Sequence, residues 1–178
     1  PPHWDQPTHR PRLGAAPELC RLAWQRRSNG VRPPVIVDLG CGDGGLVRQL
    51  LDRGATAYGY DFQPSNTAGW TRRGIRESWM FAKDFVTEWD AVMWADIYVM
   101  TEVLEHLTDP HGMLVNVRAR DAQLVCSSPA TEHAESHDEC HAWAWDEEGY
   151  AKMITDAGFT VVRHDRVGMF QVVWAVPA

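Results

Sequence analysis

The chain has 178 residues, of which 44% are hydrophobic and 23% are charged, and its formal net charge is −7. This length fits one domain with a single core, and the lack of any run of 18 apolar residues excludes a helical membrane protein. The negative charge argues against a protein that binds nucleic acid over its whole surface. Because the cysteines show no paired spacing and no signal peptide is visible, we expect a cytoplasmic protein without a membrane partner.

Residues 1–34 are rich in Pro and Arg, and we expect them to form an N-terminal lid rather than a domain. They hold six Arg against two acids, a local charge of +4, and a helical pattern over residues 17–27. Residues 121–151 show the opposite balance, with eight acids and no Lys or Arg. Two interpretations stay open for the basic end, a solvated surface and an arm that lies near an anionic substrate.

Residues 35–178 alternate between strand and helix patterns. Strands are expected at 35–40, 55–61, 79–85, 95–101, 123–129, 160–167 and 170–177, and helices at 46–54, 65–73, 110–118 and 146–159. Such alternation implies parallel strands with helices on both faces, whereas the short connection between the last two strands implies an antiparallel hairpin. The sequence therefore predicts an α/β fold with a seven-stranded mixed sheet whose last strand is antiparallel.

The stretch DLGCGDGG, residues 38–45, follows the first predicted strand. In an open α/β sheet this turn lies at a crevice, and glycines let its backbone approach a ligand, so Gly40 and Gly42 are candidate cofactor contacts. Asp61 ends the second strand about twenty residues later, where a carboxylate can accept hydrogen bonds from ribose hydroxyls. Phe62 is placed to pack on a purine. A purely structural turn is the alternative.

The stretch TEVLEHLTDP, residues 101–110, places two carboxylates and an imidazole at the end of the fourth strand. If a helix starts here, Glu102, Glu105 and His106 share one face. His141, which follows the fifth strand, is brought by the fold to the same rim and could complete a divalent metal site; Mg, Mn, Fe and Zn are not distinguished. His106 as a general base without metal, and a purely structural role, remain open. A zinc site built on His133, His137 and His141, with Cys140 between them, is disfavoured because no second ligand pair is evident.

The order and spacing of these motifs resemble class I S-adenosylmethionine-dependent methyltransferases over residues 35–176. The resemblance implies a Rossmann-like fold and a binding site for S-adenosylmethionine. It further implies that the turn around Cys41 borders the methionine part of the cofactor, that Asp38 orients this turn, and that Asp84 and Phe85 border the adenine.

The second stretch resembles two metal-dependent groups within that class, the small-RNA 3′-terminal 2′-O-methyltransferases and the ubiquinone-type O-methyltransferases. The first group also shares a His followed by an aromatic residue and Trp, here His141, Trp143 and Trp145. Both resemblances imply a metal that holds the acceptor hydroxyl. We expect methylation of a small organic hydroxyl, in which Glu102, Glu105, His106 and His141 are the catalytic and metal-binding residues. The alternatives are methylation of RNA 3′ ends, metal-independent methyl transfer, a nicotinamide oxidoreductase and a cofactor-binding module without turnover.

Overall fold

The computed structural model describes residues 7–27, 32–133 and 135–178, and it confirms the predicted order of strands and helices. Residues 1–6 and 28–31 of the predicted lid lie outside the described residues. The helices are α1 (Arg10–Arg27), α2 (Gly45–Asp52), α3 (Thr67–Arg72), α4 (Pro110–Arg118) and α5 (Glu147–Asp156), with short 3-10 turns η2 (Pro64–Asn66), η3 (Glu77–Trp79), η4 (Trp89–Ala91) and η5 (Leu104–His106). The strands are β1 (Val35–Leu39), β2 (Thr56–Tyr60), β3 (Met80–Phe81), β4 (Ile97–Thr101), β5 (Gln123–Pro129), β6 (Phe159–Val167) and β7 (Phe170–Pro177).

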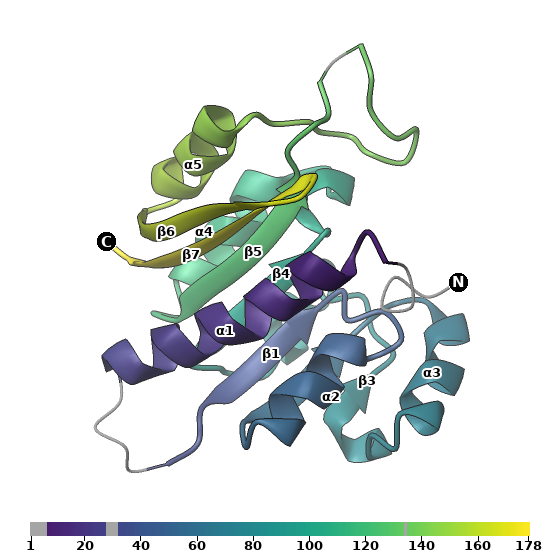
Figure 1. Cartoon of the computed structure of the whole chain (residues 1–178). Helices are drawn as coiled ribbons and strands as arrows, with labels where there is room; N and C mark the ends of the chain where they lie inside the picture. Colours follow the sequence, from purple (N-terminus) through teal and green to yellow (C-terminus); the bar gives the residue numbers. More distant parts are fainter. Residues whose placement is uncertain (1–6, 28–31, 134) are drawn as a thin grey trace.

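Seven strands of the described chain form one sheet in the order β3-β2-β1-β4-β5-β7-β6 (Figure 1). Strands β1 to β5 pair in parallel, and β7 lies antiparallel between β5 and β6. Strands β1, β2, β4 and β5 therefore end at the same edge of the sheet. This edge carries both motifs that the sequence singles out.

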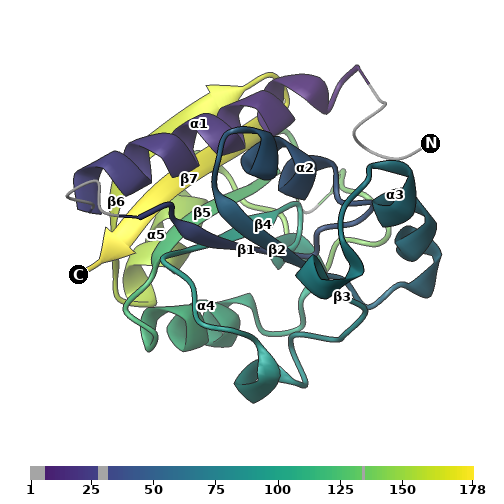
Figure 2. The ribbon, with the colours of Figure 1, turned by 90° about the horizontal axis from the view of Figure 1, so that it is seen from below.

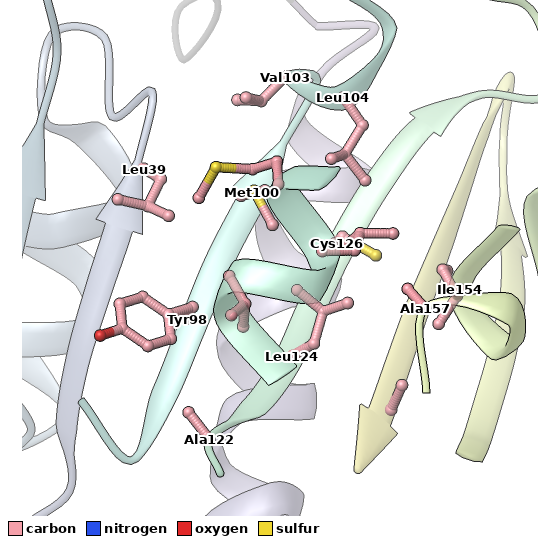
Figure 3. Packing of buried hydrophobic residues seen from close by; sticks show 14 of the residues in the cluster. Leu39, Tyr98, Met100, Val103, Leu104, Ala122, Leu124, Cys126, Ile154 and Ala157 are labelled. Carbon is pink, nitrogen blue, oxygen red and sulfur yellow. The ribbon is translucent and has the colours of Figure 1, made fainter. Parts of the chain in front are cut away.

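Helices cover both faces of the sheet, as predicted. Figure 2 shows α1 and α2 on one side and α4 on the other. Each side has its own apolar cluster, and Figure 3 shows the one to which Leu39, Met100 and Leu124 of the sheet and Ile154 of α5 belong. Strands β4 and β5 are buried along their whole length because their two faces both contact helices.

Helix α1 begins earlier than the predicted 17–27 and packs on the sheet. Leu19, Cys20 and Ala23 are buried in the cluster between α1, α2 and the strands. Pro17 lies inside the helix, where it cannot donate to the carbonyl of Leu13. That carbonyl instead accepts a hydrogen bond of 3.0 Å from the side chain of Gln49 on α2. In the described part of the predicted lid, α1 thus packs directly on the sheet.

Two local predictions are wrong. Strand β3 has two residues rather than the seven of 79–85, because the chain turns away after Phe81. No α-helix starts at Glu102: its φ is +58°, in the left-handed region, and a single 3-10 turn, Leu104–His106, follows. Glu102 consequently leaves the helical face that it was expected to share with Glu105 and His106. None of the helices in the described ranges has the length and apolar character that crossing a bilayer requires.

Candidate functional site

The glycine turn is anchored to the end of β2 by its own backbone. The amides of Gly40 and Cys41 both donate to the carbonyl of Tyr60, at 2.8 and 3.0 Å. The amide of Gly42 donates to Oδ2 of Asp61 at 2.8 Å. These bonds join the two positions that sequence spacing paired, and they shape the turn before any ligand arrives.

Asp61 organises this corner of the sheet. Besides the bond from Gly42, its Oδ1 accepts from the amide of Gln63 at 2.8 Å and from Nδ2 of Asn66 at 3.0 Å. A carboxylate has about four acceptor positions, so three donors leave room for one hydroxyl of a ligand. Beside it Phe62 presents a ring that is 63% exposed, as a face for a flat ligand requires. Asp61 can thus accept from one of the two ribose hydroxyls that it was predicted to bind, and Phe62 is free to pack on a purine.

Gly40 and Gly42 are required for different reasons. Gly40 has a φ of +76°, and a Cβ there would lie 2.5 Å from Cγ2 of Val103. Val103 follows β4, so this contact joins the glycine turn to the second motif. Gly42 has a φ of +53°, but a Cβ there would meet nothing within 4 Å. The turn is thus open on the Gly42 side, where a ligand can approach the backbone.

The remaining predicted cofactor residues differ in access. Asp38 and Cys41 are buried, and burial raises the pKa of Asp38 to about 8 and that of the Cys41 thiol well above its usual range. The Asp38 atom Oδ1 has no hydrogen-bond partner. Asp84 is half-buried and caps the amide of Val86. The ring of Phe85 packs in the core, so only its backbone could border an adenine.

Glu102 points toward α1 and β5 rather than toward the histidines. Its Oε1 accepts a hydrogen bond of 2.8 Å from Ser127 and lies 3.7 Å from a guanidinium nitrogen of Arg12. Burial raises the pKa of the Glu102 carboxyl, although the nearby Arg12 opposes this shift. Glu102 is therefore half of a buried ion pair.

Arg12 is a site residue that the sequence reasoning missed. Its side chain is 2% exposed, stacks over the ring of Phe170 at 5.1 Å and donates to Nδ1 of His9. Burial lowers the pKa of its guanidinium, while three carboxylates, those of Glu102, Glu105 and Asp38, oppose this shift. The signal was an arginine in register with the apolar residues Ala16, Leu19 and Ala23 of the same helix, because a cation on the buried face needs an acid partner.

Glu105 carries the least satisfied polar group of the site. The residue is 0% exposed, and neither carboxylate oxygen has a hydrogen-bond partner. Burial, together with the neighbouring charge of Glu102, raises the pKa of this carboxyl well above its usual range. Its backbone carbonyl accepts bonds from the amides of Ala142 and Trp143, which draws the loop after β5 onto η5. A buried carboxylate without a donor needs either a proton or a cation.

His106 and His141 lie against Glu105. Ligand atoms of these three residues all fall within 4.8 Å of one another, and the imidazole centroids are 4.6 Å apart. Nδ1 of His106 donates to the carbonyl of Cys140 at 3.0 Å, and Nδ1 of His141 donates to the carboxylate of Glu132 at 2.6 Å. On each neutral ring Nε2 therefore carries the lone pair. Histidines that bind metals are commonly oriented in this way, by a hydrogen bond from the other ring nitrogen to a carbonyl or carboxylate.

The structure thus brings together three of the four predicted metal ligands, without Glu102. In the described residues no candidate metal group includes His133, His137 or Cys140. The side chain of His137 instead contacts the carbonyl of Asp138. A carboxylate and two imidazoles suit a borderline divalent cation, so the donor set fits the predicted metal.

A family model described as a methyltransferase domain matches residues 12–164 of the chain. The match begins within α1 and includes the glycine turn, Glu105, His106 and His141. No curated protein matches the chain in a sequence comparison.

Solved structures with the same fold include three methyltransferases. Magnesium protoporphyrin IX methyltransferase from Synechocystis PCC 6803, with bound S-adenosylhomocysteine, has a TM-score of 0.68 at 18% identity, covering 94% of this chain and 85% of that one. The 1,6-didemethyltoxoflavin-N1-methyltransferase from Burkholderia thailandensis has a TM-score of 0.66 at 21% identity, covering 96% and 84%. A SAM-dependent methyltransferase from Aquifex aeolicus has a TM-score of 0.68 at 18% identity, covering 98% and 95%. At these identities the likeness establishes the fold.

Proposed function

The chain belongs to the methyltransferase-domain family and is an S-adenosylmethionine-dependent methyltransferase; from that premise we propose that it methylates a hydroxyl of a small organic molecule with help from a divalent metal. The observation that carries the proposal is the group of Glu105, His106 and His141, in which Glu105 is buried, His141 is half-buried and His106 is exposed. It lies at the same sheet edge as the glycine turn, to which Val103 connects it.

The residues in and around the glycine turn fit the cofactor. Gly42 leaves open space beside its backbone, Asp61 keeps an acceptor position, and Asp38 holds a buried oxygen without a partner. Asp61 would hold the ribose, the turn from Gly40 to Gly42 the methionine part, and Phe62 the adenine. When bound, the cofactor supplies an electrophilic methyl on a sulfonium. The chain's part is alignment, because in-line transfer depends mainly on placing the acceptor oxygen behind that methyl.

Glu105, His106 and His141 would hold the metal. When bound, a divalent cation lowers the pKa of a hydroxyl that it contacts. Glu132 fixes the ring of His141 and Cys140 fixes that of His106, so neither imidazole needs to reorient. Arg12 offsets the charge of Glu102 beside this group.

Metal content and turnover test this proposal. We expect protein purified without chelator to carry about one divalent ion per chain, and methyl transfer from labelled cofactor to fall at least about tenfold after chelation and return on adding metal. Glu105→Gln should lose the ion. His133→Gln, an exposed histidine of the same loop outside the ligand group, should keep it. Full turnover after rigorous metal removal would end the metal half of the proposal.

Metal-independent transfer with a histidine base is the second candidate. The hydrogen bond of 2.6 Å between Glu132 and His141 favours it, because a carboxylate that orients an imidazole also stabilises the imidazolium formed on proton uptake. In this case chelation leaves turnover unchanged. Glu132→Gln then lowers kcat and shifts the acid limb of the pH–rate profile.

A further inference from the structure

We propose that the acceptor is a planar aromatic hydroxyl compound, neutral or cationic, and that Trp143 is the surface against which its ring stacks. This inference rests on the proposed methyl transfer and names the class of acceptor.

Trp143 is held rigidly although much of it faces solvent. It is 44% exposed, yet its Nε1 donates to the carbonyl of Leu107 at 2.9 Å and its amide donates to the carbonyl of Glu105. Residues 143–146 are not helical, and an extended chain puts alternate side chains on one side, so Trp145 lies parallel to it with centroids 6.1 Å apart and planes within 2°. An exposed indole with a fixed orientation is suited to stacking.

Two hollows flank this indole. One, of about 260 Å³, is lined by His137, His141, Ala142, Trp143 and Ala144. The other, of about 310 Å³, lies between α4 and α5. Its lining residues are Asp109, Pro110, His111, Trp143, Trp145, Gly149, Lys152, Met153 and Asp156.

The first hollow adjoins the candidate metal ligands. It includes His141, which belongs to the ligand group with Glu105 and His106. A ring that lies on Trp143 in this hollow therefore carries its substituents toward His141. The volume lies near the lower end of the range for small-molecule sites, roughly 300 Å³, which suits a compound of one or two rings.

The charge around the hollows selects against anions. Residues 121–151 hold eight acids and no Lys or Arg. The second hollow adds Asp109 and Asp156, and its one Lys, Lys152, is paired with Asp156 at 2.6 Å. A phosphate chain would have to lie against this negative surface without the cations that nucleic-acid sites supply. A neutral ring meets no such cost, and a cationic one gains attraction from the acids and the indole.

Binding of four matched naphthols, measured by calorimetry on chelated protein saturated with S-adenosylhomocysteine, tests the proposal. The probes are naphthol, a naphthol with an aminomethyl group, a naphthol with a carboxylate, and the saturated analogue decahydronaphthol. We expect the first two to bind, the carboxylate to bind at least about tenfold more weakly, and the saturated ring about fivefold more weakly. Removing the metal first keeps metal chelation out of the comparison.

Variants locate the binding surface. Trp143→Leu should weaken naphthol about tenfold and Trp143→Phe should restore most of the affinity, because a flat ring returns. Trp94→Leu is the control: Trp94 is 68% exposed but precedes β4 at the opposite edge of the sheet. Unchanged affinity in Trp143→Leu, preference for the carboxylate, or no binding of any probe would overturn the inference. Failure to bind S-adenosylhomocysteine would instead overturn the cofactor half of the proposed function.

Discussion

The two halves of the carboxyl edge differ in how their polar groups are satisfied. At the glycine turn, Asp61 receives three N–H donors, two from residues that closely follow it in the chain and one from the turn after β1. At the end of β4, Glu105 is buried with two oxygens that receive none. The carboxylate of Asp61 is held by three donors of the folded chain, whereas that of Glu105, like Oδ1 of Asp38, has no donor. The Asp61 carboxylate is thus oriented before any ligand binds, whereas the Glu105 carboxylate is left for a ligand or a proton to complete.

Arg12 offsets the negative charge near the end of β4, so removing it should have the largest effect on stability. Arg12→Met leaves Glu102 without its buried cation, and we expect the free energy of unfolding to fall by about 3–5 kcal/mol. Chemical denaturation measures this change. Arg10→Met, an exposed position on the same helix, should cost less than about 0.5 kcal/mol. Equal stabilities of the two variants would show that the acids do not depend on Arg12.

Removing the carboxylate of Asp61 should lower the affinity for the cofactor more than it lowers the stability of the fold. Asp61→Ala leaves the amides of Gly42 and Gln63 without a partner and removes the proposed ribose contact. We expect affinity for S-adenosylhomocysteine to fall by about 10- to 100-fold, which is what one or two lost charge-assisted hydrogen bonds give. Titration calorimetry measures this. Asp84→Ala, which lies outside this hydrogen-bond set, should have a smaller effect, and the reverse order would count against Asp61.

Val103 joins the two halves, and a pair of glycine variants can isolate that contact. Gly40→Ala and Gly42→Ala both place a side chain at positive φ, but only at Gly40 does the new Cβ meet Val103, at 2.5 Å. We expect Gly40→Ala to be less stable than Gly42→Ala by about 1–3 kcal/mol. Adding Val103→Ala to Gly40→Ala should recover part of this difference in thermal or chemical unfolding. No recovery would mean that strain at φ, not the contact, sets the cost.

The sequence predicts the positions of the residues at the glycine turn well, and those at the end of β4 only in part. The reason is physical. The strand, the glycines and Asp61 act through neighbours in the chain, so spacing alone places them. The position of Glu102 depends on a left-handed turn after β4, which no local pattern in EVLEH encodes. The role of Arg12 depends on the tertiary packing of α1 against three acids, one from β1 and two that follow β4. His141 was placed at the right rim because the ends of parallel strands gather there.

The smallest expected effect is at Asp38, a residue of β1 whose carboxyl group is influenced by Arg12. Burial raises its pKa to about 8 in the folded protein, from about 4 when unfolded, so folding retains a proton that the unfolded chain releases. The stabilising contribution is therefore complete below about pH 4 and is lost as the pH rises toward 8. Between pH 6 and 7 we expect the free energy of unfolding to fall by about 1 kcal/mol more in the parent than in Asp38→Asn, which cannot titrate. Denaturation at both pH values measures the difference. Identical slopes would show that Arg12 keeps Asp38 ionised, and that the charge compensation of the second half reaches into the glycine turn.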